Sequence, residues 1–165
     1  MENKVQKRFF IFIGRSGGGK GTQAQLLKTY LEGKGYESVQ HITTGGGFRA
    51  FIQGDSHVAA LARDINDRGG LQPEFLAVWN WSNIFINTLK GNETVILDGA
   101  PRKTFEIEVL HSAVNFFGYE NPVVIYLDVP EGVSREHLKS RGRSDDLDEK
   151  NTDNKMSWFD TDIIP

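Results

Sequence analysis

A glycine-rich segment that ends on a lysine, GRSGGGKGT at residues 14–22, is the part of the sequence best suited to chemistry. Glycines have no Cβ, so this backbone can curl and present successive N–H groups to the oxygens of a phosphate. Lys20 adds a positive charge for phosphate, and Thr22 provides a hydroxyl one position later than usual because Gly21 intervenes. The segment predicts a phosphate-binding loop, with a glycine-rich turn or linker as the alternative.

The residues on either side of this loop predict the elements that position it. FFIFI at residues 9–13 is a continuous apolar run, which is typical of a strand buried on both faces in a parallel sheet. Apolar residues at helical spacing follow from Thr22 to about Glu32, and Gly33 with Gly35 predict the end of that helix. A strand, a GxxxxGK loop and a helix in this order form a far more specific pattern than a lone GxGxxG.

The rest of the chain alternates in the same way, without an internal repeat or a low-complexity tract. We expect further strands at 39–44, 94–97 and 122–129, and helices at 48–52, 55–69, 73–90, 104–117 and 131–140. Alternating strands and helices predict an α/β fold, namely a doubly wound parallel sheet flanked by helices, of the P-loop NTPase type. Trp79, Trp81 and Phe85 are expected in the core of this fold.

An acidic residue, Asp98, ends the third expected strand. The carboxyl ends of parallel strands border the crevice where such sheets bind ligands, so Asp98 can meet the metal that accompanies bound phosphates. An aspartate that serves only a turn is the alternative. His41, inside the second expected strand, is interpreted as a core or edge side chain rather than a metal ligand.

Composition limits the class of protein. A chain of 165 residues predicts one domain, and a net charge of −3 argues against a nucleic-acid-binding surface. The absence of cysteine excludes disulfides and cysteine-based metal sites. No apolar stretch approaches the roughly 20 residues of a membrane span, so we expect no membrane partner and a cytoplasmic location.

Four separated segments, GRSGGGKGTQ, TTGGGFRA, LDGAPR and SRGRSDD, occur in the order of comparable motifs in adenylate kinases. The chain resembles the short-lid members of this nucleoside monophosphate kinase family over nearly its whole length. The resemblance implies one P-loop kinase domain over 1–165, without zinc. Its core would comprise 1–43, 75–140 and 153–165, with a monophosphate-binding insert at about 44–74 and a short lid at about 141–152.

The resemblance also implies an activity, in which Mg²⁺-ATP donates its γ-phosphoryl group to a nucleoside monophosphate, with AMP as the favoured acceptor. The acceptor oxygen is already ionised, so such a site needs positive charge and positioning rather than a nucleophilic side chain. By resemblance, Asp98 orients Mg²⁺ through water, and the catalytic cations are Lys20, Arg102, Arg141 and Arg143. ATP is expected to contact Gly17, Gly18, Gly19, Lys20, Gly21, Thr22, His137 and Arg141. The monophosphate is expected to contact Thr44, Arg49, Gly70, Leu71, Gln72, Gly99, Arg102, Glu106, Arg143 and Lys155.

Several positions depart from the family pattern. Gly46 replaces an acid, Glu106 replaces the glutamine that reads adenine, His137 replaces an arginine at the ATP base, and Lys155 replaces the last lid arginine. Ionised glutamate can only accept hydrogen bonds, which makes the preference for AMP weaker. Two alternatives stay open: a kinase for UMP or CMP, and a degenerate ATP-binding protein with little turnover. A hydroxyl acceptor of the shikimate type is disfavoured, because LDGAPR and the lid arginines suit a phosphate.

The family continues past the proline that matches Pro165 with a helix, a strand and a final helix. Without that strand, residues 122–129 are expected to form an exposed sheet edge. The family predicts a monomer, whereas an exposed edge predicts lower stability or association through it.

Overall fold

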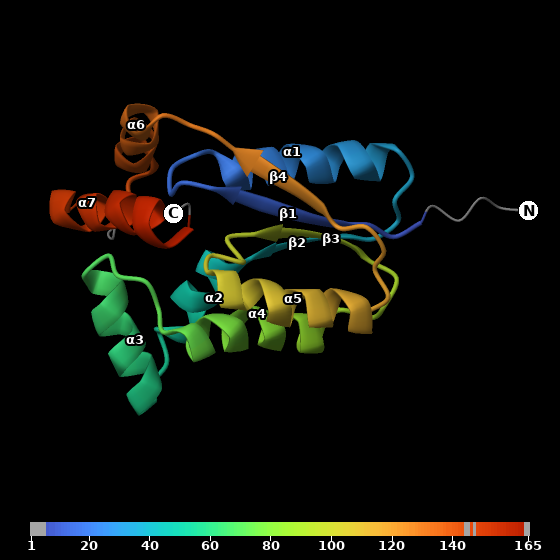
Figure 1. Ribbon diagram of the computed structural model, residues 1–165, viewed down its shortest axis with the longest axis horizontal. Coiled ribbons are helices and arrows are strands. Elements are labelled where there is room, and N and C mark those ends of the chain that lie inside the picture. Colours follow the sequence, from blue (N-terminus) through green and yellow to red (C-terminus); the bar gives the residue numbers. More distant parts are fainter. Residues whose placement is uncertain (1–5, 144–145, 147, 164–165) are drawn as a thin grey trace, which may run out of the picture.

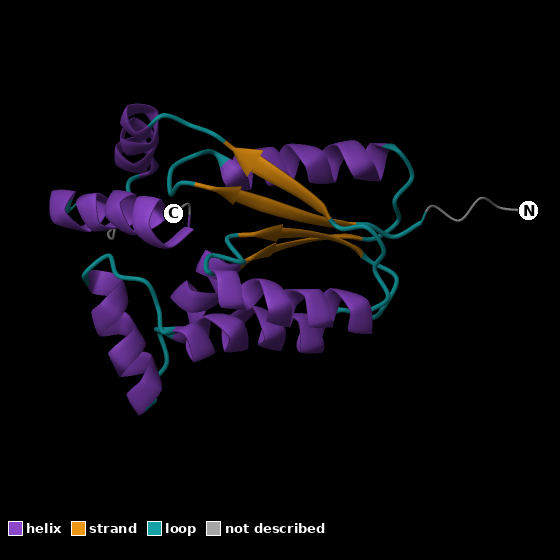
Figure 2. Ribbon diagram, in the orientation of Figure 1, coloured by secondary structure: helices purple, strands orange, loops and turns teal. Residues whose placement is uncertain are grey.

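Four parallel strands form the centre of the molecule, and helices cover both faces of the sheet (Figures 1 and 2). The computed structural model describes residues 6–143, 146 and 148–163. The strand order is β2-β3-β1-β4, and this confirms the predicted α/β parallel fold. The strands are β1 (Phe9–Gly14), β2 (Val39–Thr43), β3 (Thr94–Asp98) and β4 (Val123–Leu127).

Helix α1 (Lys20–Gly33) lies on one face of the sheet, and three helices lie on the other (Figure 1). These three are α2 (Thr44–Phe51), α4 (Glu74–Thr88) and α5 (Thr104–Phe116). The remaining helices lie beyond the carboxyl ends of the strands: α3 (His57–Asp67), α6 (Glu131–Arg141), α7 (Glu149–Trp158) and a π-helical turn (Phe159–Ile163). None of the described helices is long and apolar enough to cross a membrane.

The apolar run in β1 supplies both cores, because successive side chains of a strand point to opposite faces. Phe9 and Ile11 pack with Trp81 and Phe85 in one cluster, whereas Phe12 packs under α1 in the other. Trp81 and Phe85 are therefore core residues, as predicted. Trp79 is not: its side chain is 41% exposed and leans on Phe51, with ring centroids 4.8 Å apart, because it lies on the outer side of α4.

Helix α2 begins earlier than the glycines suggested. The sequence predicted a helix at 48–52, after the three glycines, yet α2 runs from Thr44. Tertiary contacts override the low helix propensity of glycine here. Asn80 of α4 donates to the Thr44 carbonyl at 2.9 Å, and a Cβ on Gly47 would collide with the Asn80 side chain. The glycines thus allow α2 and α4 to approach closely.

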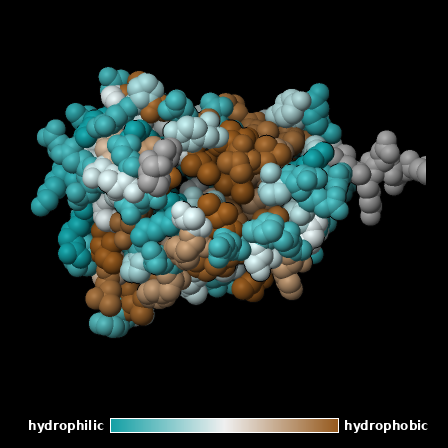
Figure 3. Space-filling view, viewed as in Figure 1, coloured by the Kyte–Doolittle hydropathy of each residue, from teal (hydrophilic) through white to brown (hydrophobic). Residues whose placement is uncertain are grey.

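Strand β4 is an edge strand with an unusual surface. Its sequence predicted a buried strand, but Val124 and Tyr126 are 58% and 48% exposed. Among the described residues, no strand pairs with its outer edge. Figure 3 shows apolar side chains gathered where β4 lies in Figure 1. The predicted exposed edge is present, and association through it stays a prediction, as does the division into core, insert and lid.

Candidate functional site in the cleft at the carboxyl ends of the strands

A cleft of about 1090 Å³ opens at the carboxyl ends of the strands. The phosphate loop, the ends of β2, β3 and β4, and residues of α6 and α7 line it. Its size suits a nucleotide-sized ligand. All predicted site residues line this cleft except Thr44, Leu71 and Glu106, which line a smaller adjacent pocket.

The glycine-rich loop has the backbone that the sequence predicted. Gly17 and Gly19 have φ values of 81° and 79°, a region that residues with a Cβ rarely adopt. A Cβ on Gly17 would also collide with the Ser134 carbonyl of α6, so α6 packs directly against the loop. Helix α1 begins at Lys20, two residues before the predicted start. The positive end of its dipole therefore faces the cleft directly behind the loop.

Lys20 lies inside the loop with its ammonium group on backbone oxygens. Its Nζ donates to the Gly14 and Arg15 carbonyls, each at 2.8 Å. Burial is the main cause that lowers the pKa of Lys20 to about 8; Asp98 opposes this shift, and the charges of Arg102 and Arg141 add to it. Burial removes water from this ammonium group, so a bound phosphate would stabilise its charged form.

Arg102 approaches the same place from the segment after β3. Its Nε donates to the Gly99 carbonyl at 2.9 Å, and Thr44 Oγ1 donates to the same oxygen, also at 2.9 Å. Burial lowers the pKa of Arg102, while Glu106 and Asp98 act in the opposite direction. The structure thus brings together Thr44, Gly99 and Arg102, three residues that the sequence assigned to the monophosphate.

Asp98 ends β3 beside the phosphate loop, as predicted. A Cβ placed on Gly21 would lie 3.6 Å from Asp98 Oδ2, and His41 Nε2 lies 3.9 Å from the same oxygen. A carboxylate next to a phosphate loop is the kind of oxygen ligand that Mg²⁺ uses, so the donor chemistry fits this ion. His41 Nε2 is buried without a hydrogen-bond partner among the described residues, and burial lowers the pKa of His41.

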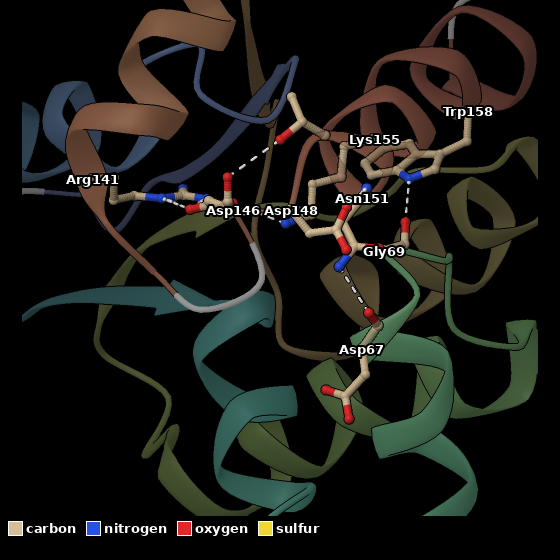
Figure 4. A network of polar contacts seen from close by, with 9 residues as sticks. Asp67, Gly69, Arg141, Asp146, Asp148, Asn151, Lys155 and Trp158 are labelled. Atoms are coloured by element: carbon tan, nitrogen blue, oxygen red, sulfur yellow. Dashed lines mark hydrogen bonds and ion pairs between the residues drawn. The ribbon is translucent and has the colours of Figure 1, made fainter.

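Arg141, a predicted lid arginine, is the last residue of α6 and is held by a carboxylate. Its Nε and Nη2 donate to Asp146 at 2.8 and 2.9 Å, and Lys155 Nζ donates to Asp146 Oδ1 at 2.9 Å. The Asp146 side chain is completely buried (Figure 4). Arg141 and Lys155 thus share one buried counter-charge. Arg143 lines the cleft, and Asp145, the first residue of the acidic pair, lies outside the described residues.

His137 and Arg49 also line the cleft, but their contacts are local. His137 Nδ1 lies 2.8 Å from the Gly17 carbonyl, so the ring contacts the phosphate loop in this structure. Arg49 lies against Gly45 within α2, where an added Cβ would come within 3.2 Å of Nη1. Both remain close enough to the cleft for the predicted contacts with ATP and the monophosphate.

Glu106 has a structural role that the sequence did not indicate. Its Oε1 accepts the N–H groups of Arg102 and Lys103 at 3.1 and 3.2 Å, and so caps the start of α5. It shares the small pocket with Gln72, whose Nε2 donates to the Ala62 carbonyl at 2.8 Å. Gln72 Oε1 is buried without a hydrogen-bond partner among the described residues. Gln72 and Glu106 thus contribute an amide and a carboxylate to the lining of this pocket, which has a volume of about 20 Å³.

Sequence reasoning missed Trp158, which lines the cleft from α7. No motif surrounds this residue, and a tryptophan in an otherwise polar helix was the one signal that could have drawn attention to it.

Comparison with known proteins agrees with this geometry. Residues 13–153 match a protein family described as "AAA domain". An adenylate kinase from Prochlorococcus marinus (strain AS9601) is 35% identical over 143 residues, which cover 87% of this chain and 74% of the relative. Adenylate kinases from Mycobacterium leprae (strain Br4923) and Porphyromonas gingivalis (strain ATCC 33277) are 34% and 33% identical. Those matches cover 84% and 82% of this chain, and 73% and 69% of the relatives. This chain therefore belongs to the adenylate kinase family of P-loop proteins.

Proposed function

We propose that the protein is a nucleoside monophosphate kinase that transfers the γ-phosphoryl group of ATP to a monophosphate, with AMP as the favoured acceptor. The observation that carries the proposal is the position of Lys20 and Arg102 in one cleft. Lys20 comes from the ATP-binding loop and Arg102 from the segment assigned to the acceptor. Both are partly desolvated cations whose pKa values burial lowers, as suits groups that stabilise a phosphoryl group in transfer.

In this proposal the loop N–H groups and Lys20 bind the β and γ phosphates of ATP, and Arg102 binds the acceptor phosphate. Mg²⁺, held through water by Asp98, would neutralise phosphate charge and orient the γ-phosphoryl group. Because the acceptor oxygen is ionised at neutral pH, no side chain has to remove a proton. Walls formed by α3, α6 and α7 would limit access of water, which competes with the acceptor.

The choice of base rests on the small pocket beside Arg102. Glu106 and the unpartnered Oε1 of Gln72 are acceptors, so they suit a base with an exocyclic amine. Adenine, cytosine and guanine carry such an amine, whereas uracil has carbonyl oxygens instead. The two acceptors therefore disfavour UMP, and the preference for AMP over CMP and GMP rests on the family resemblance.

A second candidate is an ATP-binding protein with little turnover. It is favoured by one specific observation: Asp146 already binds Arg141, a predicted catalytic cation, and Lys155, which was expected to contact the monophosphate. In that case Arg141 and Lys155 would stabilise the fold rather than the reaction.

A coupled assay of ADP formation with AMP, CMP, UMP and GMP separates these candidates when ATP binding is measured on the same samples by calorimetry. We expect ADP formation with AMP above that with the other acceptors, and ATP binding with micromolar to millimolar affinity. ATP binding without ADP formation from any acceptor would support the second candidate. A lack of ATP binding would contradict both.

A further inference from the structure

Three side chains of α7 bind the end of α3. Asn151 Nδ2 donates to the Asp67 carbonyl at 2.8 Å, Asn154 Nδ2 to the Arg68 carbonyl at 2.8 Å, and Trp158 Nε1 to the Gly69 carbonyl at 3.2 Å. Figure 4 shows Asn151 and Trp158 reaching from α7 toward Asp67 and Gly69. Residues 151, 154 and 158 share one face of a helix, and the last carbonyls of a helix have no partner within it. Three N–H donors of α7 thus match three successive carbonyl groups at the end of α3.

Gly69 makes this approach possible. Its φ of 65° lies in the left-handed region, and a Cβ on Gly69 would lie 2.7 Å from the Asn151 carbonyl oxygen and 2.8 Å from Asn151 Cα. A side chain at position 69 would thus push α3 away from α7. Backbone contact, and not only side-chain reach, holds the end of the predicted insert against α7.

Trp158 also contacts the proposed reaction centre. The guanidinium carbon of Arg102 lies 5.5 Å from the centroid of the Trp158 ring, within the range of a cation–π interaction. Trp158 and Arg102 both line a small cavity under the phosphate loop, together with Gly14 and Lys20. Trp158 thus binds Gly69 of the predicted insert through its N–H and faces Arg102 with its ring.

We propose that Trp158 is a positioning residue that couples the docking of residues 67–69 on α7 to the placement of Arg102. This inference rests on the proposed kinase function. When the end of α3 docks, the bond from Trp158 Nε1 to Gly69 fixes the orientation of the indole. The fixed ring then holds the guanidinium of Arg102 toward the acceptor phosphate, so Arg102 is correctly placed only when residues 67–69 are docked on α7.

The experiment separates the two contacts of Trp158 with two variants and a control. Trp158→Phe keeps an aromatic face for Arg102 and loses the N–H, whereas Trp158→Leu loses both. Asn154→Ala is the control, because it removes a bond of the same docking face without touching Arg102. Each variant is measured for kcat, for the KM of AMP, and for hydrogen exchange at the amides of residues 67–70.

We expect Trp158→Phe and Asn154→Ala to raise the KM of AMP by about two- to tenfold, since each loses one hydrogen bond of the docked state. Asn154→Ala should keep a nearly unchanged kcat, whereas Trp158→Phe should lower kcat by about two- to threefold, because its ring still faces Arg102 but is no longer fixed by Gly69. Trp158→Leu should show the same rise and, in addition, a fall in kcat of roughly tenfold, because Arg102 loses the ring. All three should exchange faster at residues 67–70. If Trp158→Leu keeps the kcat of Trp158→Phe, Trp158 does not act through Arg102 and the proposal is wrong.

A fourth variant makes the test independent of turnover and of the folding of Trp158→Leu. Since coupling is reciprocal, Arg102→Ala should loosen the indole and speed exchange at residues 67–70. Unchanged exchange in Arg102→Ala would overturn the coupling. A wild-type chain that forms no ADP would contradict the proposed function, yet this exchange result would still decide whether Trp158 links Arg102 to the insert.

Discussion

Two pairs of cationic side chains line the cleft, and they differ in what surrounds them. We call Lys20 and Arg102 the floor pair, and Arg141 and Lys155 the rim pair. The floor pair donates to neutral backbone carbonyls of Gly14, Arg15 and Gly99. The rim pair donates to the buried carboxylate of Asp146.

Because of these different partners, the positive charge of the floor pair can act on a ligand, whereas the charge of the rim pair is partly compensated by Asp146. A carbonyl accepts a hydrogen bond but leaves the positive charge in place, and burial then lowers the pKa values of both floor residues. A bound phosphate would offset the free-energy cost of burying these two charges. Asp146 instead neutralises part of the rim charge within the fold. We therefore expect the floor pair to govern turnover and the rim pair to govern stability.

The largest expected effect comes from the floor. Lys20→Met or Arg102→Ala should lower kcat by roughly two to three orders of magnitude, because each removes a cation that faces the transferring group. The melting temperature should change little. Lys34→Met, on the exposed end of α1, is the control and should keep full activity. A near-normal kcat in both floor variants would mean that the phosphate site is assigned wrongly.

The next effect tests the rim. Asp146→Asn should lower the free energy of unfolding by about 3 kcal/mol, because it removes the negative charge of a completely buried side chain that binds both Arg141 and Lys155. Urea unfolding measures this loss. The matched control is Asp153→Asn, which breaks the exposed pair with Arg135 at 2.6 Å and should cost less than about 1 kcal/mol. If both variants lost the same free energy of unfolding, the rim pair would contribute no more to stability than an exposed ion pair, and the comparison would be wrong.

The pH dependence of ATP binding tests the protonation state of Lys20, one residue of the floor pair. Lys20 has a pKa of about 8, so it is charged in the free protein below that pH and neutral above it. Phosphates favour the charged form, and ATP binding above pH 8 must then take up a proton. We expect the affinity to be constant from about pH 7 to 7.5 and to fall by up to about tenfold per pH unit above 8.

Calorimetry in two buffers with different ionisation enthalpies detects this proton uptake. Lys20→Arg is the control: its guanidinium stays protonated, so the variant should show no pH dependence of ATP affinity in this range.

The stability of the ligand-free fold should change with pH in the opposite direction to the ATP affinity. A folded-state pKa below the ordinary value of 10.5 means that the unfolded chain binds more protons between about pH 8 and 10.5, so the ligand-free fold gains stability from Lys20 as the pH rises through that window.

The smallest expected effect concerns Glu106, whose carboxylate lies near the floor. Glu106→Gln keeps an oxygen that can cap α5, so stability should fall by no more than about 1 kcal/mol. The loss of a negative charge near Arg102, and the gain of an amide donor, should tighten AMP binding a few-fold and narrow the choice of base. Titrations with AMP, CMP, UMP and GMP test this. Unchanged affinity for every base would leave Glu106 as a cap alone.

Local patterns in the sequence were enough to predict the phosphate loop and Lys20. A buried apolar strand, a GxxxxGK loop and a helix start are adjacent in the chain, so the position of Lys20 follows from short-range rules. Asp98 was likewise placed by the strand that it ends. The order of strands and helices predicted the parallel sheet, because each element carries its own hydrophobic period.

Tertiary structure alone decided which distant groups meet. Helical period implies that Trp79 and Trp81, two residues apart, lie on opposite sides of α4, but the position of α4 against the sheet decides that Trp81 is the buried one. Likewise, nothing in the residues around Asp146, Glu106 or Trp158 indicates their partners: two cations, two backbone N–H groups, and Gly69 with Arg102. A hydrophobic pattern reports which face of an element is buried, whereas these pairings depend on how close folding brings separate elements, down to the missing Cβ of Gly69.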